Sequence, residues 1–140
     1  MDSPENINSN LEPCRRKILV VDDDKQIRDV FATILAGEIS CEVDVAKDGI
    51  EACNLFAEQH YAVIVMDMHM PTLGGMEAFA RIRAYCEAAR LAMPAVIFCT
   101  AYDPPNTLQN LLSQDSNHTL VRKPVSNNDL VALVHKRLPT

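Results

Sequence analysis

Tryptophan is absent from this sequence, and aromatic residues make up only 5% of its 140 residues. Nearly half of the residues, 48%, are nevertheless apolar. This combination predicts a core built from aliphatic strands and alanine-rich helices, and it excludes disorder over most of the chain. A chain of this length is expected to form one domain with a core of its own.

Basic residues are too few and too scattered for a nucleic-acid partner. The sequence has 13 lysines and arginines against 19 aspartates and glutamates, a formal net charge of −6. Its one basic cluster is Arg15-Arg16-Lys17. Proteins that bind the phosphates of nucleic acids carry clustered positive charge, so we expect this chain to bind no nucleic acid.

The sequence also lacks long apolar runs and paired cysteines. No stretch approaches the roughly 18 to 20 apolar residues of a membrane-spanning helix, and the first residues lack the layout of a signal peptide. The cysteines have no C-x-x-C spacing, and we interpret them as reduced, structural residues. They are Cys14, Cys41, Cys53, Cys86 and Cys99. These absences predict a cytoplasmic protein with no membrane partner.

Residues 1–16 differ in composition from the rest of the chain. They are rich in asparagine, serine, proline and glutamate, and they show no hydrophobic periodicity. We therefore predict a flexible N-terminal tail over residues 1–16 and a folded domain over residues 17–138.

From Lys17 onward, short apolar runs alternate with helical patterns. The predicted strands are residues 18–21, 41–45, 61–66, 95–99 and 119–122. The predicted helices are residues 27–35, ending before Gly37, then 50–58, 76–88, a short helix around 108–112, and a last helix up to Leu138 after a capping box at 126–129. This alternation predicts an α/β fold of three layers, with a doubly wound, five-stranded parallel sheet.

The pattern within each strand predicts its place in the sheet. The run 41–45 alternates apolar and polar residues, as expected of a strand with one wet face at a sheet edge. The run 61–66 is continuously apolar, as expected of a strand covered on both faces. The flavodoxin-like strand order 2-1-3-4-5 follows, with its switch point between the first and third strands.

Four of the predicted strands end at residues suited to one phosphoryl-transfer site. Asp22 and Asp23 follow the first strand, Asp67 the third, Thr100 the fourth and Lys123 the fifth. Ligands of such sheets bind outside the carboxyl ends of the strands, so we expect these side chains to converge.

The predicted group of acids implies a bound cation. Crowded carboxylates repel one another and are stable together in ionised form only beside positive charge. An oxygen-only ligand set predicts Mg²⁺. A carboxylate beside that metal can attack phosphorus and form an acyl phosphate. The metal and Lys123 would take up charge on the phosphoryl oxygens, and the Thr100 hydroxyl would donate a hydrogen bond to one of them.

Four short motifs, taken together, carry a family resemblance. They are Lys17-Ile-Leu-Val-Val-Asp-Asp-Asp24, Val65-Met-Asp67-Met-His-Met70-Pro71-x-x-x-Gly75, Thr100-Ala101 and Lys123-Pro124. In order and spacing they resemble the response regulator receiver domain of two-component signalling. The resemblance covers residues 17–138.

The resemblance implies a role for each site residue. The implied phosphoacceptor is Asp67, which would also contact Mg²⁺. The other implied metal ligands are Asp23 directly, Asp22 through water, and His69 through its backbone carbonyl. Thr100 would be the switch hydroxyl, and Lys123 would pair with the phosphate. The Lys123-Pro124 bond would be cis.

The resemblance also implies a function and partners. The chain would be a signalling switch of a phosphorelay, accepting a phosphoryl group from a phosphohistidine on a sensor histidine kinase or a histidine phosphotransfer protein. It would catalyse its own phosphorylation and slow dephosphorylation, without acting on a separate metabolite. A downstream protein would bind the face of the fourth helix, fifth strand and fifth helix, where Arg122, Lys136 and Arg137 make a mildly basic patch.

Some positions depart from the family pattern or bear on its output. Leu120 stands where the family usually has a tyrosine or phenylalanine that reports phosphorylation. His69 and Tyr102 occupy the positions that tune the lifetime of the phosphoryl group in this family. The segment 113–118 lacks the small residues common before the fifth strand.

Plainer or competing interpretations accompany these assignments. Asp24 is expected to cap the helix that follows it. The histidines, His60, His69, His118 and His135, are interpreted as solvated or locally bonded. A haloacid-dehalogenase-like Mg²⁺ phosphatase would use Asp22 as nucleophile, although Gln26 stands where that motif has threonine or valine. A docking module that works unphosphorylated is the third hypothesis.

Overall fold

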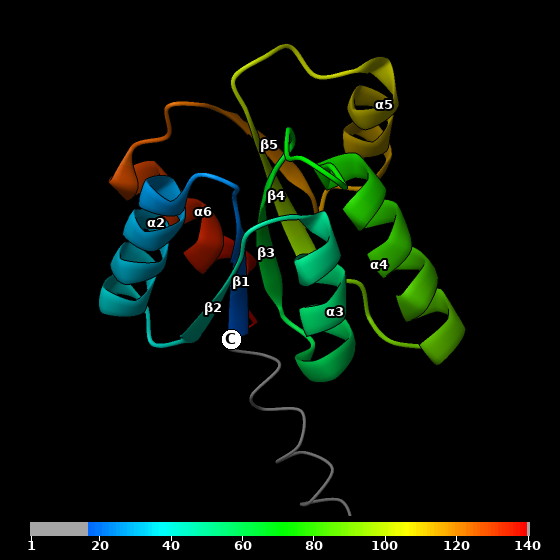
Figure 1. Ribbon diagram of the computed structural model, residues 1–140, viewed down its shortest axis with the longest axis horizontal. Coiled ribbons are helices and arrows are strands. Elements are labelled where there is room, and N and C mark those ends of the chain that lie inside the picture. The colour runs from blue at the N-terminus through cyan, green and yellow to red at the C-terminus, as the bar shows by residue number, and fades with distance from the viewer. Residues whose placement is uncertain (1–16, 140) are drawn as a thin grey trace, which may run out of the picture.

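The computed structural model describes residues 17–139, so the predicted tail, residues 1–16, lies outside the described residues. Within that range five strands alternate with five helices (Figure 1). The elements are β1 (Lys17–Val21), α2 (Lys25–Glu38), β2 (Glu42–Ala46), α3 (Gly49–Gln59), β3 (Val63–Asp67), α4 (Gly75–Ala89), β4 (Ala95–Thr100), α5 (Asn106–Gln114), β5 (Thr119–Arg122) and α6 (Asn127–Arg137).

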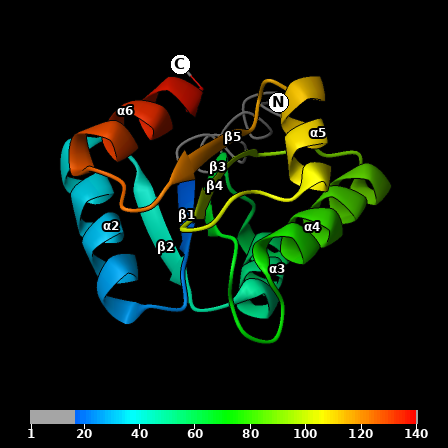
Figure 2. The same ribbon diagram turned by 90° about the horizontal axis from the view of Figure 1, so that it is seen from above.

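The sheet is parallel throughout, with the order β2-β1-β3-β4-β5. Helices α2 and α6 cover one face of the sheet, and α3, α4 and α5 cover the other (Figure 2). The predicted α/β fold, its three layers and its strand order are therefore confirmed. No helix in the part of the chain that the structure describes is long and apolar enough to span a membrane.

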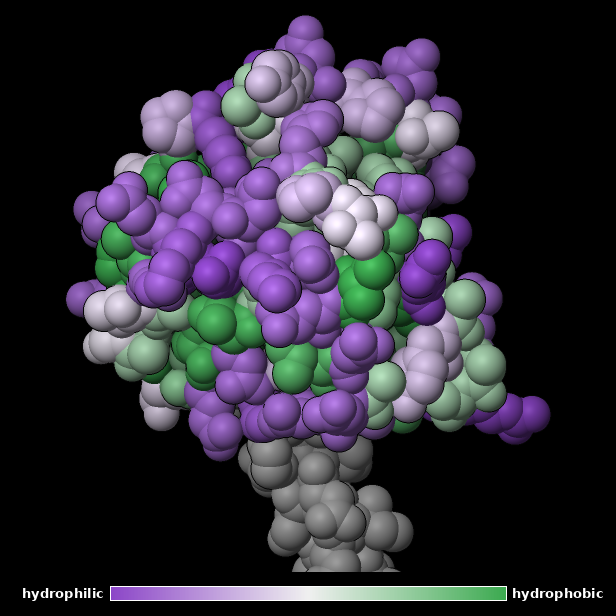
Figure 3. Space-filling view, in the orientation of Figure 1, coloured by the Kyte–Doolittle hydropathy of each residue, from purple (hydrophilic) through white to green (hydrophobic). Residues whose placement is uncertain are grey.

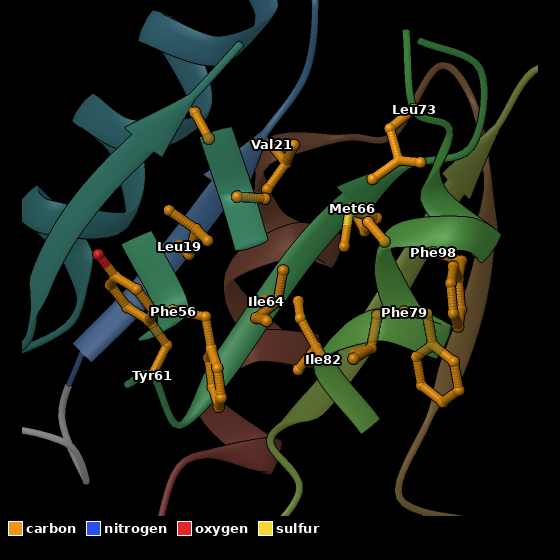
Figure 4. Close-up of a cluster of buried hydrophobic side chains, with 14 of the residues drawn as sticks. Leu19, Val21, Phe56, Tyr61, Ile64, Met66, Leu73, Phe79, Ile82 and Phe98 are labelled. Atoms are coloured by element: carbon orange, nitrogen blue, oxygen red, sulfur yellow. The ribbon is translucent and has the colours of Figure 1, made fainter. Parts of the chain in front are cut away.

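The core consists of one apolar cluster on each side of the sheet. Alternate residues of β1 point to opposite clusters, Ile18 and Val20 to one and Leu19 to the other. Figure 4 shows the larger cluster, where the rings of Phe79 and Phe98 pack with their centroids 5.4 Å apart. Because both faces of the central strands are covered, these strands read as unbroken apolar runs.

The edge strand β2 differs from the simple alternation that its sequence suggested. Its edge position is confirmed, but Val45 is 39% exposed, whereas Asp44 is half-buried. The Asp44 carboxylate accepts a hydrogen bond of 2.7 Å from the hydroxyl of Tyr61. The predicted strand 61–66 starts later in the structure, since Tyr61 lies before β3.

Capping residues mark the helix boundaries better than glycine residues do. Asp24 caps α2, since its carboxylate accepts hydrogen bonds from the backbone N–H groups of Gln26 and Ile27. The predicted cap Ser126 likewise accepts from the Asp129 N–H. The predicted stop before Gly37 is wrong, because α2 continues to Glu38 and ends where Ile39 enters the core.

The loops that follow β1, β3, β4 and β5 gather at the upper edge of the sheet in Figure 1. Polar side chains cover most of the face shown in Figure 3, and its apolar residues form small separate groups. The carboxyl ends of the strands, which carry the residues of the predicted site, therefore lie at this upper edge.

Candidate functional site

Three carboxylates meet at the carboxyl ends of β1 and β3. Asp22, Asp23 and Asp67 each offer one oxygen, and these oxygens lie within 4.8 Å of one another. Asp22 is 2% exposed and Asp67 is 5% exposed, whereas Asp23 faces solvent. An all-oxygen set with one solvent-facing member fits a hard divalent cation that keeps part of its water shell.

Strand register brings the acids together. Val21 of β1 pairs with Met66 of β3, so the residues that follow them, Asp22 and Asp67, lie side by side. Gly75 permits the loop after β3 to fold close, because a Cβ there would lie 2.5 Å from the Asp67 carbonyl oxygen. A larger residue at this position would push that loop away from the end of β3.

The turn after β1 is fixed by three hydrogen bonds to Asp22. Its N–H donates to the Ala46 carbonyl at 3.2 Å, and its Oδ1 accepts from the Asp24 N–H at 2.9 Å. The Arg28 guanidinium donates to its carbonyl oxygen at 2.7 Å. Sequence reasoning missed Arg28, for which the one available signal was a basic residue one turn after the cap Asp24.

Lys123 extends from the end of β5 into the acidic cluster. Its Nζ lies 3.0 Å from Asp22 Oδ2 and 3.3 Å from Asp67 Oδ1. Its backbone N–H donates to the Thr100 carbonyl at 2.8 Å, and the following bond to Pro124 is cis, as the resemblance implied. The ammonium therefore bridges the two buried acids.

Thr100 lies at the same edge of the sheet, but its hydroxyl turns away from the acids. The hydroxyl donates to the Tyr102 carbonyl at 3.1 Å and accepts from the Tyr102 N–H at 3.0 Å. Asp67 pairs with Cys99 in the sheet, so Thr100 lies one residue beyond the acid along β4. A bond from this hydroxyl to a group on Asp67 would require its release from the Tyr102 loop.

His69 is adjacent to the cluster through its backbone. Its N–H donates to Asp67 Oδ1 at 3.4 Å, and its side chain is exposed. The His69 ring meets the Tyr102 ring edge to face, with centroids 5.0 Å apart. Two loops after different strands thus touch beside Asp67, a contact that the sequence did not predict. The predicted metal contact of the His69 carbonyl stays a prediction.

The electrostatics of the cluster favour added positive charge. Burial, and then the neighbouring charge of Asp22, raise the pKa of Asp67 to about 6, although Lys123 acts in the opposite direction. Burial alone would lower the pKa of Lys123, but its hydrogen bond to Asp22 and the charges of both acids outweigh burial and raise that pKa. One ammonium does not offset burial and the repulsion between the carboxylates together, so a cation bound here would be stabilised.

His118, His60 and the predicted basic residue Arg137 differ in how their side chains are hydrogen-bonded. His118 is buried and locally bonded, as predicted, because it accepts from the Val96 N–H at 3.1 Å. His60 is half-buried, and its Nε2 has no hydrogen-bond partner. In the predicted basic patch, Arg137 donates to the Ser116 carbonyl at 2.9 Å, so its charge is held inside the fold.

Comparison with known proteins agrees with this geometry. The sequence pattern of the response regulator receiver domain matches residues 18–135. The chain is 34% identical over 121 residues to the CAI-1 autoinducer sensor kinase/phosphatase CqsS of Vibrio cholerae, covering 83% of this chain and 17% of that protein. It is 30% identical over 122 residues to the regulatory protein AtoC of Escherichia coli, covering 87% of this chain and 25% of that protein.

Solved structures share the fold. The receiver domain of the Francisella response regulator 1452 superposes with a TM-score of 0.70 at 31% identity, covering 88% of this chain and 96% of that one. The chemotaxis protein CheY4 of Vibrio cholerae gives a TM-score of 0.70 at 24% identity, covering 87% of this chain and 98% of that one. The chain spans a quarter or less of CqsS and AtoC, but nearly all of these two structures.

Proposed function

This chain belongs to the response regulator receiver domain family of two-component signalling, and from that premise we propose that Asp67 accepts a phosphoryl group from a phosphohistidine. The proposal assigns this role to the domain of residues 17–138. One observation carries it: the carboxylate of Asp67 lies within 4.8 Å of two further acids and 3.3 Å from an ammonium. Acids and a lysine in that arrangement can hold a phosphoryl group and a divalent cation together.

The metal in this proposal is Mg²⁺. Asp23 and Asp67 would hold it directly with their carboxylates, Asp22 through water, and His69 with its backbone carbonyl. When bound, Mg²⁺ neutralises negative charge on the phosphoryl oxygens. The all-oxygen composition of the cluster supports this choice of ion.

The chain's own residues have distinct tasks in the transfer. The Asp67 carboxylate attacks phosphorus, the bond from phosphorus to the donor imidazole breaks, and an acyl phosphate forms on Asp67. Lys123 moves its hydrogen bond from the carboxylate to a phosphoryl oxygen. The Thr100 hydroxyl leaves the Tyr102 loop and donates to another phosphoryl oxygen, which couples phosphorylation to the conformation of that loop.

We propose that the donor protein binds beside the acids, over a groove between α2 and the start of α6. This groove has a volume of about 480 Å³ and is lined by Ile27, Val30 and Phe31 of α2 and by Pro124 and Val125 after β5. Val30 is 49% exposed, so an apolar side chain is available for contact. Lys123 lines the same groove, so a docked donor would lie close to Asp67.

A downstream partner would use the face of α5, β5 and α6. Helices α5 and α6 are the fourth and fifth helices of the sequence analysis. Lys136 is exposed on this face and borders a groove shared with Val121 and Pro124. Arg122 is exposed as well, but it pairs with Asp103 at 2.6 Å. Lys136 is therefore the basic side chain that we assign to this contact. We also propose that the donor is a sensor kinase or a phosphotransfer protein. We propose a cytoplasmic location as well.

The phosphatase alternative is less favoured by the contacts of its nucleophile. Asp22 would have to attack phosphorus, yet its Oδ1 accepts from the Asp24 N–H and its Oδ2 is bound to Lys123. The two schemes differ in which aspartate carries the phosphoryl group. A docking module that works without phosphorylation would carry none.

The test is intact-mass measurement and peptide mapping after incubation with acetyl phosphate. We expect a phosphoryl adduct that requires Mg²⁺, maps to the peptide containing Asp67, and disappears in the variant Asp67→Asn. The matched variant Asp24→Asn changes a cap outside the cluster and should keep the adduct. An adduct on Asp22 would support the phosphatase scheme, and no adduct under any condition would support the docking module.

A further inference from the structure

A groove lies at the lower edge of the sheet, where the strands begin, far along the strands from the acids. Its volume is about 390 Å³. Its walls come from α3 and from the loops before β3 and β4, and they are mainly apolar: Phe56, Leu91, Met93 and Pro94. Apolar walls of this kind with a few polar groups are typical of binding sites.

Two residues that line the groove carry polar atoms without partners. His60 Nε2 and Arg137 Nε are buried, and neither makes a hydrogen bond. The other guanidinium nitrogens of Arg137 are used, one by the Ser116 carbonyl and one by the Thr119 hydroxyl. Buried donors without partners destabilise a fold, so a carboxylate that reached Arg137 here would be stabilising.

The backbone of His60 is also unusual. Its φ of 48° lies in the left-handed region, which residues other than glycine rarely adopt. Its ring packs against Phe56, with centroids 5.3 Å apart. Such strained residues concentrate at sites that hold ligands. The groove therefore combines apolar walls, two unpartnered donors or acceptors, and a strained residue.

The chain enters the described structure next to this groove. Lys17, the first residue of β1, accepts a hydrogen bond of 2.9 Å from the N–H of Ala62, and Ala62 lines the groove. Ala62 in turn accepts from Ala95, which lines it as well. Figure 1 places the start of β1 at the lower edge of the sheet. Any segment that precedes Lys17 therefore begins within one strand spacing of the groove, about 5 Å.

We propose that this groove binds the protein's own segment Leu11-Glu12-Pro13-Cys14, which lies outside the described residues. Five extended residues reach about 17 Å, so Glu12 can span the groove from Lys17. Leu11 supplies an apolar side chain for the walls, and the Glu12 carboxylate places a negative charge beside the Arg137 guanidinium. Because the segment is covalently attached, its effective concentration at the groove is on the order of millimolar.

A second copy of the chain is the weaker occupant. Stable protein interfaces bury about 800 Å² on each partner, whereas a groove of about 390 Å³ accommodates only a few side chains. A short tethered segment fits that size, and its acidic residue complements the charge of Arg137. The acids at the opposite edge take no part, so this proposal stands apart from the proposed phosphorylation.

The test is disulfide formation in the full chain carrying Ala92→Cys. Ala92 is exposed and lines the groove, so a cysteine there can pair with Cys14 under mild oxidation. We expect an intramolecular disulfide between Cys14 and position 92. Adding Leu11→Ser should slow its formation by about tenfold, the change expected from losing one buried leucine side chain, whereas Ile7→Ser should change it by less than about twofold.

These controls separate docking from mere proximity. Both serine variants keep the tether and leave the described fold untouched, so a loss with Leu11→Ser alone supports the groove. Glu12→Gln should give a smaller decrease in the same assay than Leu11→Ser, and Glu5→Gln should give none. Equal rates with and without Leu11 would overturn the proposal. So would a Cys14 linkage to Cys41, which would place the segment at β2, or a disulfide between two chains, which would indicate a second copy.

Discussion

The ammonium of Lys123, at the end of β5, lies 3.3 Å from the carboxylate of Asp67, at the end of β3. The same ammonium donates a hydrogen bond of 3.0 Å to Asp22. It occupies the space where charges of a phosphoryl group and a cation would meet in the proposed reaction. The lysine thus lowers the repulsion between two buried acids in the absence of either ligand.

Removing this ammonium should affect both stability and titration. In the variant Lys123→Met, we expect the pKa of Asp67 to rise above about 6, because Lys123 acts to lower it. We also expect a loss of about 1 to 3 kcal/mol in the free energy of unfolding at pH 7, since Lys123 is partly exposed. Denaturant unfolding measures the stability, with the exposed Lys136→Met as control. Equal losses in both variants would contradict the bridging role.

The buried charge of Asp67 should make stability depend on pH. Its pKa is raised from an ordinary 3.8 to about 6, so between these values the folded chain binds more protons than the unfolded chain. This group's contribution therefore favours the fold below pH 4 and falls as pH rises to about 6, by about 2 to 3 kcal/mol. Asp67→Asn should remove that fall and be more stable than the parent at pH 7. Unfolding curves of both proteins from pH 4.5 to 7.5 provide the comparison.

Adding Mg²⁺ should reverse the loss of stability that ionised Asp67 causes in the parent protein at pH 7. A bound cation compensates the ionised carboxylates, so we expect Mg²⁺ to raise the stability of the parent at pH 7 much more than that of Asp67→Asn. Equal stabilisation of both proteins would indicate that the ion binds elsewhere.

His118 should make the junction of β4 and β5 sensitive to acid. Its Nδ1 accepts from the Val96 N–H, and its Nε2 lies 3.2 Å from Asp115, so protonation would place a donor against the Val96 donor. Burial lowers its pKa below the ordinary 6.5, an effect that Asp115 opposes and that Arg137 and Arg83 strengthen. The unfolded chain then binds more protons below pH 6.5, so stability falls as pH drops.

The matching variant is His118→Gln. We expect this variant to lose the acid sensitivity. We also expect its free energy of unfolding at pH 7 to fall by about 1 to 2 kcal/mol, because the Val96 N–H is then less well hydrogen-bonded. His135→Gln, at an exposed position of α6, is the control. Nuclear magnetic resonance titration of the His118 ring should give a pKa below the ordinary 6.5, and a pKa above that value would contradict the prediction.

Arg28 is a positioning residue for the metal site. Its bond of 2.7 Å to the Asp22 carbonyl holds the turn that carries two of the acids. We expect Arg28→Met to weaken Mg²⁺ binding by about three- to tenfold, as for a loss of about 1 kcal/mol. The labelling rate at saturating Mg²⁺ should stay close to that of the parent. Arg28→Lys should recover part of the affinity, and Lys25→Met, at an exposed position of the same helix, should change nothing.

On the proposed output face, reversing the charge of Lys136 should have a different effect from reversing that of Arg137. Arg137 bonds to the Ser116 carbonyl and the Thr119 hydroxyl, so Arg137→Glu should lower the melting temperature as well as any partner affinity. Lys136→Glu should leave stability unchanged and weaken partner binding, while labelling of Asp67 continues. Unchanged partner affinity in Lys136→Glu would argue against this face.

The sequence was sufficient for the fold class, the strand order and the convergence of the acids, because these depend on local signals. The continuous apolar run before Asp67 required a strand covered on both faces, and the capping residues Asp24 and Ser126 marked helix starts within a few positions. In a parallel sheet, residues at strand ends must share one edge, so the placement of Asp22, Asp67 and Lys123 followed from order alone.

Tertiary packing decided the features that join distant segments. The His69 ring meets the Tyr102 ring, Arg137 turns into the loop before β5, and His118 replaces a backbone acceptor for Val96. Nothing within a few residues of these positions specifies such contacts, because side-chain direction depends on which loops and helices meet there. The groove at the lower edge arises in the same way, from loops that only the folded sheet brings together.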